Sequence, residues 1–559
     1  MQKLAATSLA ALLAAGTLPT PAFAAGRNEG LPTATPIKHL VVIFNENVSF
    51  DHYFGTYPSA TNPAGEPKFY PLPGTPGVNG LTSLLLNTNP NLLNTANNAT
   101  LSSGAVSIAA NPFRLDRSQA ATADQDHNYG PEQAAFHAGL MDLFPLSVGT
   151  EGPPPSAPPA AAKTTALTMG YFDGNTVTAM WNYAQHFAMS DNMYDTNFGP
   201  STPGALNVIA GQTNGVTSTT VKINNSTIVA DGNGGQTLIS DADPAGDVCS
   251  STSKNVSMSG NNIGDLLNTG GVSWGFFAGG FDLTITNSAT STTGCKRSTL
   301  STVTGVTETD YIPHHQPFQY YASTQNLAHT RPASISAIGV ANDAVAHNQY
   351  DVHDFFDAVK AGNFPAVAYL KAPGYQDAHA GYSDPLDEQT FIVNTINFLE
   401  QQPEWSSTAV IITYDDSDGW YDHQMSPIVN QSQTPADQLT GAGLCGSSTP
   451  ALAGLTASGA QGRCGYGPRL PFVVISPWAK DNYVSHVVLD QSSVVRFIED
   501  NWLGGQRLGA GSFDAIAGSI SDMFDFSRPE CRPDKLFLNP STGEPVAAFP
   551  GLPFHFPLR

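Results

Sequence analysis

Lys38-His39-Leu40-Val41-Val42-Ile43-Phe44 is a continuous apolar run that ends at Asn45-Glu46-Asn47. A second run, Thr408-Ala409-Val410-Ile411-Ile412-Thr413-Tyr414, ends at Asp415-Asp416. Continuous apolar runs rich in branched residues predict strands that are buried on both faces, as in a parallel sheet. Because ligands of open α/β sheets bind outside the carboxyl ends of the strands, we expect the two polar clusters to meet at one edge of the sheet.

The side chains at these strand ends are hard oxygen ligands. Glu46, Asn47, Asp415 and Asp416 offer carboxylate and amide oxygens, which suit calcium, magnesium or manganese. Histidines elsewhere in the chain would also admit zinc, so the sequence leaves the identity of the metal open. The pattern indicates a metal-dependent hydrolase that carries a divalent cation.

Further strands and helices alternate along the chain. Residues 366–370 and 472–475 predict two more buried strands. Helical patterns cover Glu132–Leu143, Val177–Ala188, Asp387–Glu400 and Ser492–Trp502. The alternation predicts an α/β fold with a predominantly parallel central sheet flanked by helices.

We expect one large domain over residues 25–559, interrupted by polar segments. Residues 213–300 begin with a stretch rich in Thr, Ser, Asn and Gly and are expected to form a smaller cap. Residues 431–465 are expected to form a second insertion, in a loop.

The N-terminus has the features of a secretory signal peptide. Met1-Gln2-Lys3 is followed by an apolar stretch from Leu4 to Leu18 and by an A-x-A site that ends at Ala24. We therefore expect residues 1–24 to be removed and the protein to be periplasmic or secreted. An N-terminal membrane anchor is the alternative, although the run is short for a span, and the mature chain contains no segment long enough to cross a bilayer.

Export permits disulfides, and the chain has five cysteines. We expect Cys249 to pair with Cys295 and Cys445 with Cys464, since each bridge would close a polar, glycine-rich loop. Cys531 would then be free or bonded elsewhere. The net charge of −23 argues against nucleic acid as a partner, but it does not exclude phosphorylated small molecules or phospholipids.

A candidate nucleophile lies at the start of another predicted helix. In Gly199-Pro200-Ser201-Thr202-Pro203-Gly204, either hydroxyl residue can cap the helix, and Pro203 suits its first turn. A hydroxyl at a helix N-terminus can also attack phosphorus, because the backbone amides there attract the phosphoryl anion. A sulfatase-like segment would have arginine where this chain has Ala205.

Five motifs together resemble the bacterial acid phosphatase and phospholipase C family, within the alkaline phosphatase superfamily. They occur in family order and span residues 38–501. The motifs are Glu46-Asn47-Val48-Ser49-Phe50-Asp51-His52-Tyr53-Phe54-Gly55, Gly199-Pro200-Ser201-Thr202-Pro203, Tyr311-Ile312-Pro313-His314-His315, Ala372-Pro373-Gly374-Tyr375-Gln376-Asp377-Ala378-His379 and Tyr414-Asp415-Asp416-Ser417-Asp418-Gly419-Trp420-Tyr421-Asp422-His423.

The resemblance implies an alkaline-phosphatase-like fold and a role for each matching residue. Ser201 corresponds to the nucleophile, which also touches the metal. The implied metal ligands are Glu46, Asn47, Ser201, Asp415 and Asp416. The histidines implied to surround the phosphate are His127, His314, His315 and His379. Phospholipase C members often have Thr at the nucleophile position and Pro-Asn after it, where this chain has Ser201 and Pro203-Gly204. The pairs His314-His315 and Asp415-Asp416 resemble the acid phosphatase branch more closely.

The expected function is therefore an exported, metal-dependent acid phosphatase that hydrolyses phosphate monoesters through a phosphoserine. Its acidic optimum would follow from the need for protonated histidines at the phosphate. The alternative is a phospholipase C-type phosphodiesterase that acts on phospholipid head groups. A non-catalytic binding protein on the same scaffold is a third hypothesis, which phosphate binding without turnover would support.

Overall fold

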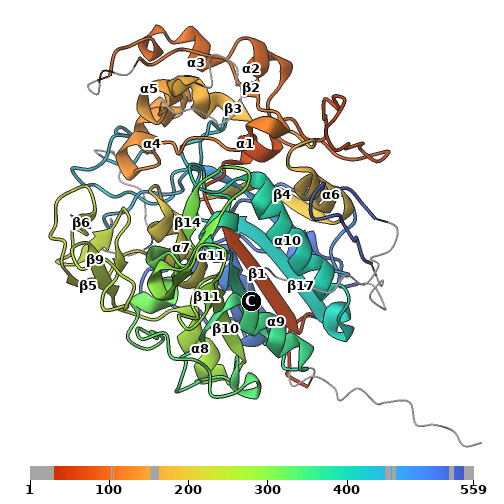
Figure 1. Cartoon of the computed structure of the whole chain (residues 1–559). Coiled ribbons are helices and arrows are strands. Elements are labelled where there is room, and N and C mark those ends of the chain that lie inside the picture. The colour runs from red at the N-terminus through yellow and green to blue at the C-terminus, as the bar shows by residue number, and fades with distance from the viewer. Residues whose placement is uncertain are drawn as a thin grey trace, which may run out of the picture.

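A nine-stranded sheet forms the centre of the protein (Figure 1). The computed structural model describes residues 30–101, 104, 106–150, 163–446, 455, 461–527 and 534–546. The strands follow the order β15-β10-β16-β1-β17-β18-β4-β19, with β20 also paired to β4. Their bounds are β1 His39–Asn45, β4 Ala188–Tyr194, β10 Trp274–Ala278, β15 Gln349–Asp351, β16 Val367–Lys371, β17 Thr408–Tyr414, β18 Arg469–Ile475, β19 Tyr483–Ser485 and β20 Leu489–Asp490.

The sheet is mixed. Strands β15, β10, β16, β1 and β17 pair in parallel. Strand β18 runs antiparallel to both of its neighbours, β17 and β4, and β4 pairs in parallel with β19 and β20. The expected α/β organisation of a large sheet with flanking helices is confirmed. An apolar run such as 472–475 carries no signal for strand direction, so the reversal of β18 could not be read from it.

Helices flank this sheet, and α9 and α10 cross the near side of its central strands in Figure 1. The helices are α1 Phe50–Phe54, α2 Ser83–Asn87, α3 Pro90–Leu93, α4 Tyr129–Phe136, α5 Phe144–Ser147, α6 Thr178–His186, α7 Ser201–Ala210, α8 Ile263–Gly270, α9 Val352–Lys360, α10 Pro385–Leu399 and α11 Ser492–Trp502. Three of the predicted helices are confirmed as α6, α10 and α11. The fourth is shorter than expected, because His137 adopts a left-handed conformation with φ of 43° and ends α4.

Small sheets occupy much of the region expected to be a cap. Strands β5 Val216–Thr219, β9 Asn255–Met258 and β8 Asp243–Pro244 form one of them, and β6 Ile228–Ala230 pairs with β7 Gln236–Leu238. The expected range of 213–300 also contains β10, however, which is a strand of the central sheet. That part of the range therefore belongs to the core, because β10 is buried between β15 and β16. The remaining two-stranded sheets are β2 Phe113–Arg114 with β3 Gly170–Tyr171, β11 Thr286–Asn287 with β12 Thr292–Thr293, and β13 Ser298–Leu300 with β14 Thr307–Thr309.

Both expected disulfides are present. Cys249 is bonded to Cys295 and Cys445 to Cys464, with Cα atoms 5.2 and 5.3 Å apart. Cys531 and the expected signal peptide lie outside the described residues. Among the helices that the structure describes, none combines the length and the apolar character needed to cross a membrane.

The register between β1 and β17 positions the site. The two strands pair in parallel from His39 opposite Thr408 to Asn45 opposite Tyr414. Both are buried along their whole length, which explains their unbroken apolar sequences. Because the strands end side by side, the residues that follow them are held at the same edge of the sheet.

Candidate active site

The two polar clusters meet at this edge, as the sequence predicts. The backbone N–H of Asn47 donates to Oδ1 of Asp415 over 2.8 Å, which joins the segment after β1 to the segment after β17. Asn47 itself has a positive φ of 57°, a left-handed conformation that asparagine tolerates better than most residues. Glu46, Asn47, Asp415 and Asp416 are all essentially inaccessible to solvent.

Three oxygen atoms of these side chains fit a cation site. Oε2 of Glu46, Oδ1 of Asn47 and Oδ2 of Asp415 are buried and have no hydrogen-bond partner among the described residues. Buried polar atoms are nearly always paired, so such unpaired acceptors require a partner. Hard oxygen donors of this kind are the ligands that divalent cations prefer.

Two residues to which the sequence assigned no role, Lys371 and Asp377, complete the cluster. Lys371, the last residue of β16, forms an ion pair with Oε1 of Glu46, and His315 places Nδ1 3.2 Å from the same oxygen. The carboxylate of Asp377 lies 3.8 Å from the His315 ring. Glu46, His315 and Asp377 together form a group whose ligand atoms could hold a metal ion.

The charge balance of the cluster also favours a cation. Burial and the neighbouring Asp415 raise the pKa of Asp416 well above its usual range, and burial does the same to Asp377. The ammonium of Lys371 interacts with four carboxyl groups, those of Glu46, Asp377, Asp415 and Asp416. Buried like charges disfavour ionisation unless a positive charge compensates them, and a divalent ion would do so.

The candidate nucleophile lies against this cluster. Ser201 is the first residue of α7, and its hydroxyl donates to Oδ2 of Asp416 over 3.2 Å. The expectation that Ser201 or Thr202 caps the helix is wrong. The N-cap is Pro200, and Asp241 accepts hydrogen bonds from both the backbone N–H and the hydroxyl of Thr202, at 2.9 and 3.0 Å.

Gly204 allows α7 to approach the carboxylate cluster closely. A Cβ atom at this position would overlap the carbonyl oxygen of Asp415. The helix start is also held by Glu132 of α4, which accepts from the Gly199 N–H at 3.0 Å and from the Ser417 hydroxyl at 2.7 Å. Burial raises the pKa of Glu132 to about 8.

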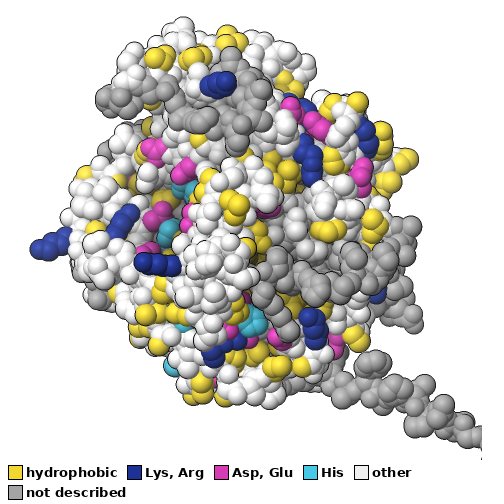
Figure 2. All heavy atoms as spheres, in the orientation of Figure 1, with side chains coloured by type: hydrophobic (Ala, Val, Ile, Leu, Met, Phe, Trp, Pro, Cys, Tyr) yellow, Lys and Arg dark blue, Asp and Glu magenta, His cyan; other side chains and the backbone are white. Residues whose placement is uncertain are grey.

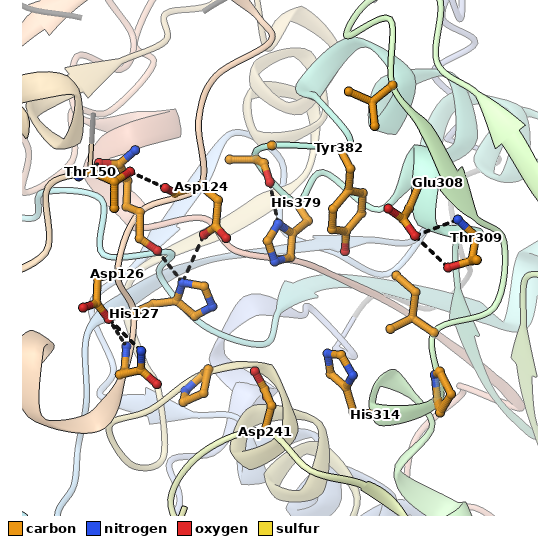
Figure 3. Close-up of a pocket in the computed structure, with 18 of the residues that line it drawn as sticks. Asp124, Asp126, His127, Thr150, Asp241, Glu308, Thr309, His314, His379 and Tyr382 are labelled. Atoms are coloured by element: carbon orange, nitrogen blue, oxygen red, sulfur yellow. Dashed lines mark hydrogen bonds and ion pairs between the residues drawn. The ribbon is translucent and has the colours of Figure 1, made fainter. Parts of the chain in front are cut away.

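Three of the predicted histidines line one cavity of about 1060 Å³. Figure 3 shows His127, His314 and His379 arranged around a common space with Asp124 and Asp241. In Figure 2, histidine and acidic side chains meet in a hollow of the visible face. His315 is not among the described residues that line this cavity. It faces Glu46 instead, so the adjacent pair His314-His315 is divided between the cavity and the carboxylate cluster.

The histidines differ in their affinity for protons. Burial would lower the pKa of His127, but the carboxylates of Asp416, Asp418 and Asp124 raise it well above its usual value. For His314, burial is likewise outweighed by the hydrogen bond to Asp243, which raises the pKa.

The other two histidines have the opposite tendency. Burial lowers the pKa of His379, and burial together with the charges of His314 and His379 lowers the pKa of His315. A neutral imidazole suits a metal ligand, and a protonated imidazole suits a contact to phosphate or to a leaving oxygen.

A profile of the Phosphoesterase family matches residues 37–503, which is most of the chain. The chain belongs to the phosphoesterase family. This membership confirms the resemblance seen in the motifs.

Several relatives of this phosphoesterase are named phospholipase C. The non-hemolytic phospholipase C of Burkholderia pseudomallei is 23% identical over 525 residues, which cover 91% of this chain and 62% of that protein. The non-hemolytic phospholipase C of Pseudomonas aeruginosa is 32% identical over 188 residues, 31% of this chain and 25% of its own length. Phospholipase C A of Mycobacterium tuberculosis is 23% identical and covers 89% of this chain and 78% of its own. The phosphoesterase thus spans less than two thirds of the first two relatives.

Solved structures are less similar to the phosphoesterase. An alkaline phosphatase superfamily protein from Vibrio parahaemolyticus is 13% identical, with a TM-score of 0.26 over 70% of this chain and 68% of its own. That score is too low to support an argument.

Four residues of the site were not predicted from the sequence, although two of them could have been. Lys371 directly follows the predicted strand 366–370, so the rule applied to β1 and β17 would have found it. Asp377 lies inside the motif that ends at His379. Glu132 and Asp241 stand in segments without such a signal, because only the folded chain brings them to α7.

Proposed function

We propose that this phosphoesterase is a phospholipase C-type phosphodiesterase. Ser201 Oγ attacks phosphorus, the bond to the diacylglycerol oxygen breaks, and that oxygen takes up a proton. Water then hydrolyses the phosphoserine and releases the phosphorylated head group. The relatives named phospholipase C support this alternative better than the acid phosphatase function that the motifs favour.

The composition of the cavity is the observation that carries the proposal. Its described lining contains five acidic residues and neither lysine nor arginine. The acidic residues are Asp124, Asp126, Asp241, Asp243 and Glu308. A phosphate monoester brings two negative charges into this field, whereas a diester brings one and adds a second substituent that can be neutral or cationic. The size of the cavity also leaves room for that substituent.

Residues of this chain orient the attack in the proposed reaction. Asp416 holds the Ser201 hydroxyl at the N-terminus of α7, where the helix dipole favours an anion. Glu46, Asn47, Asp415 and Asp416 would hold a divalent cation, with His315 and Asp377 adjoining them. When bound there, the cation would supply Lewis-acid stabilisation of charge on the phosphoryl oxygens.

His127 is the candidate proton donor to the leaving oxygen. Its Nδ1 lies 2.8 Å from the carbonyl oxygen of Gln125 and 3.3 Å from Oδ1 of Asp418, and its ring faces the cavity. The surrounding carboxylates favour its protonated form, which a general acid requires. His314 and His379 would contact the phosphate or its substituent. The acidic pH optimum and export of the protein stay predictions.

The test compares p-nitrophenylphosphorylcholine with p-nitrophenyl phosphate as substrates of purified protein. We expect kcat/KM for the diester to be about tenfold or more above that for the monoester. Ser201→Ala is expected to lower kcat by about a thousandfold or more. Thr202→Ala should keep most of the activity, because the Thr202 hydroxyl of the parent is hydrogen-bonded to Asp241. A preference for the monoester would restore the acid phosphatase hypothesis, and full activity of Ser201→Ala would exclude the serine mechanism.

A further inference from the structure

A long stretch of this acidic chain contains no ionisable side chain of the Asp, Glu, Lys, Arg or His type. It runs from Phe69 to Phe113, which is 45 residues, and lies between Lys68 and Arg114. The complete chain has 69 Asp, Glu, Lys and Arg residues and a net charge of −23. This stretch is therefore uncharged within a strongly negative protein.

Part of the stretch forms a lobe with exposed leucines, which we define as the apical lobe, the described residues 81–101, 104 and 106–111. It contains α2, α3, the 3-10 turn Thr95–Asn97 and the bridge between Thr100 and Val106. Leu84 and Leu93 are 69% and 63% exposed, and Leu92 and Ile108 are also exposed. Figure 1 shows α2 and α3 at the outer end of the molecule, and Figure 2 shows hydrophobic side chains at that end.

These exposed residues are concentrated rather than scattered. Among the described residues, seventeen large hydrophobic side chains are exposed, and five of them lie in the apical lobe: Leu84, Leu92, Leu93, Val106 and Ile108. Leu140, 59% exposed, belongs to the segment that packs against the apical lobe. Single exposed leucines need no explanation, but a concentration of them on an uncharged surface is typical of an interaction site.

The apical lobe is connected to the wall of the cavity. Asn91 of α3 donates to the carbonyl oxygen of Met141 and accepts from the Phe144 N–H, both within 2.9 Å. The same segment continues to Val148, whose carbonyl oxygen accepts from the Asp126 N–H at 2.8 Å. Asp126 lines the cavity. The lobe thus adjoins the candidate active site through one short, hydrogen-bonded segment.

We propose that the apical lobe docks on a neutral, zwitterionic phospholipid surface and presents the cavity to it. The inference deepens, and rests on, the proposed phospholipase C function. Transfer of leucine side chains from water to the interfacial region lowers the free energy of the system. An uncharged lobe also brings no ionised group that must be desolvated there. An anionic surface is disfavoured, because the rest of the chain carries a net charge of −23.

The charged groups beside the apical lobe do not oppose this docking. Asp142 is hydrogen-bonded by Asn94 and lies 2.7 Å from the His137 ring. Lys163 is exposed and lies two residues before Thr165 in the sequence. The Thr165 hydroxyl accepts from the N–H of Ile108 in the apical lobe. A lysine at the margin can direct its ammonium toward lipid phosphates.

The test measures flotation with vesicles in an inactive Ser201→Ala background, so that turnover does not enter. The parent is compared with the double variant Leu84→Asp/Leu93→Asp and with a control variant, Ile335→Asp. The control also replaces an exposed apolar side chain by aspartate, but Ile335, which is 48% exposed, lies outside the apical lobe. We expect the double variant to lower binding to phosphatidylcholine vesicles about tenfold or more, and the control to leave it unchanged. Adding phosphatidylglycerol should weaken binding of the parent at low salt.

The same substitutions in the active protein separate docking from catalysis. We expect kcat/KM for soluble p-nitrophenylphosphorylcholine to stay within about twofold, while hydrolysis of vesicular phosphatidylcholine falls about tenfold or more. Equal vesicle binding by parent and double variant, or none by the parent, would overturn the docking proposal even if the soluble diester is hydrolysed. Vesicle binding without hydrolysis of any ester would overturn the proposed function instead. A dimer that is lost in the double variant, without vesicle binding, would identify a second copy as the occupant.

Discussion

The Ser201 hydroxyl donates to Oδ2 of Asp416 over 3.2 Å and so connects the start of α7 with the end of β17. This contact requires α7 to lie almost against the backbone of Asp415, which the absence of a side chain at Gly204 permits. The position of the candidate nucleophile therefore depends on the packing of a helix against a strand end.

The substitution Gly204→Ala tests this packing. We expect kcat to fall by about a hundredfold, because the added methyl group must displace either α7 or the Asp415 carbonyl. Gly77→Ala serves as the control, since a Cβ there meets no atom of the structure within 4 Å. Unchanged kinetics of Gly204→Ala, measured with p-nitrophenylphosphorylcholine, would show that the contact does not position Ser201.

Removal and return of metal should change stability as well as activity. After chelation, we expect calcium, magnesium, manganese or zinc to raise Tm, by the equivalent of about 3 kcal/mol at a hundredfold excess over Kd. Glu46→Gln and Asp415→Asn should abolish most of this rise, whereas Asp357→Asn on α9 should not affect it. Differential scanning calorimetry measures the Tm of each variant without a substrate. An equal rise in all variants would place the cation elsewhere.

Glu132 is expected to act as a positioning residue. Its carboxylate accepts from both the Gly199 N–H and the Ser417 hydroxyl, so it joins the segments that carry Ser201 and Asp416. Glu132→Gln keeps one acceptor and should lower kcat about tenfold, and Glu132→Ala should lower it further, with little change in KM. A rise in KM at constant kcat would indicate a role in substrate binding instead.

The stability of the protein should depend on pH through Glu388. This buried carboxyl accepts from Asn45, Tyr53 and Tyr414, and burial raises its pKa from 4.5 to about 7. The native state therefore holds the proton more tightly than the unfolded state. The contribution to the free energy of unfolding is complete below pH 4.5 and is lost as pH rises to about 7, with a loss of up to about 3 kcal/mol.

Denaturant unfolding at several pH values checks this prediction. Glu388→Gln cannot ionise, so its free energy of unfolding should fall less than that of the parent between pH 4.5 and pH 7.5. Parallel curves for the two proteins would show that Glu388 does not titrate in this range.

Much of the site could be predicted from short segments. The strand ends at Glu46-Asn47 and Asp415-Asp416 converge as expected, since parallel neighbouring strands end at the same edge. The neighbouring Lys371 was missed although it ends β16 by the same rule. The pair His314-His315 could not be resolved, because neighbouring residues have nearly the same sequence context but face different groups in the fold.

The sequence by itself determined the buried strands, the residues at their ends and the family. Each follows from a local pattern, because burial, strand formation and motif chemistry depend on residues close together in the chain. Only the tertiary structure decided the direction of β18, the ion pair of Lys371 with Glu46, and the two hydrogen bonds of Glu132. It also decided that an uncharged lobe lies beside an acidic cavity. These features join segments tens or hundreds of residues apart, and their energies depend on distances that no local pattern encodes.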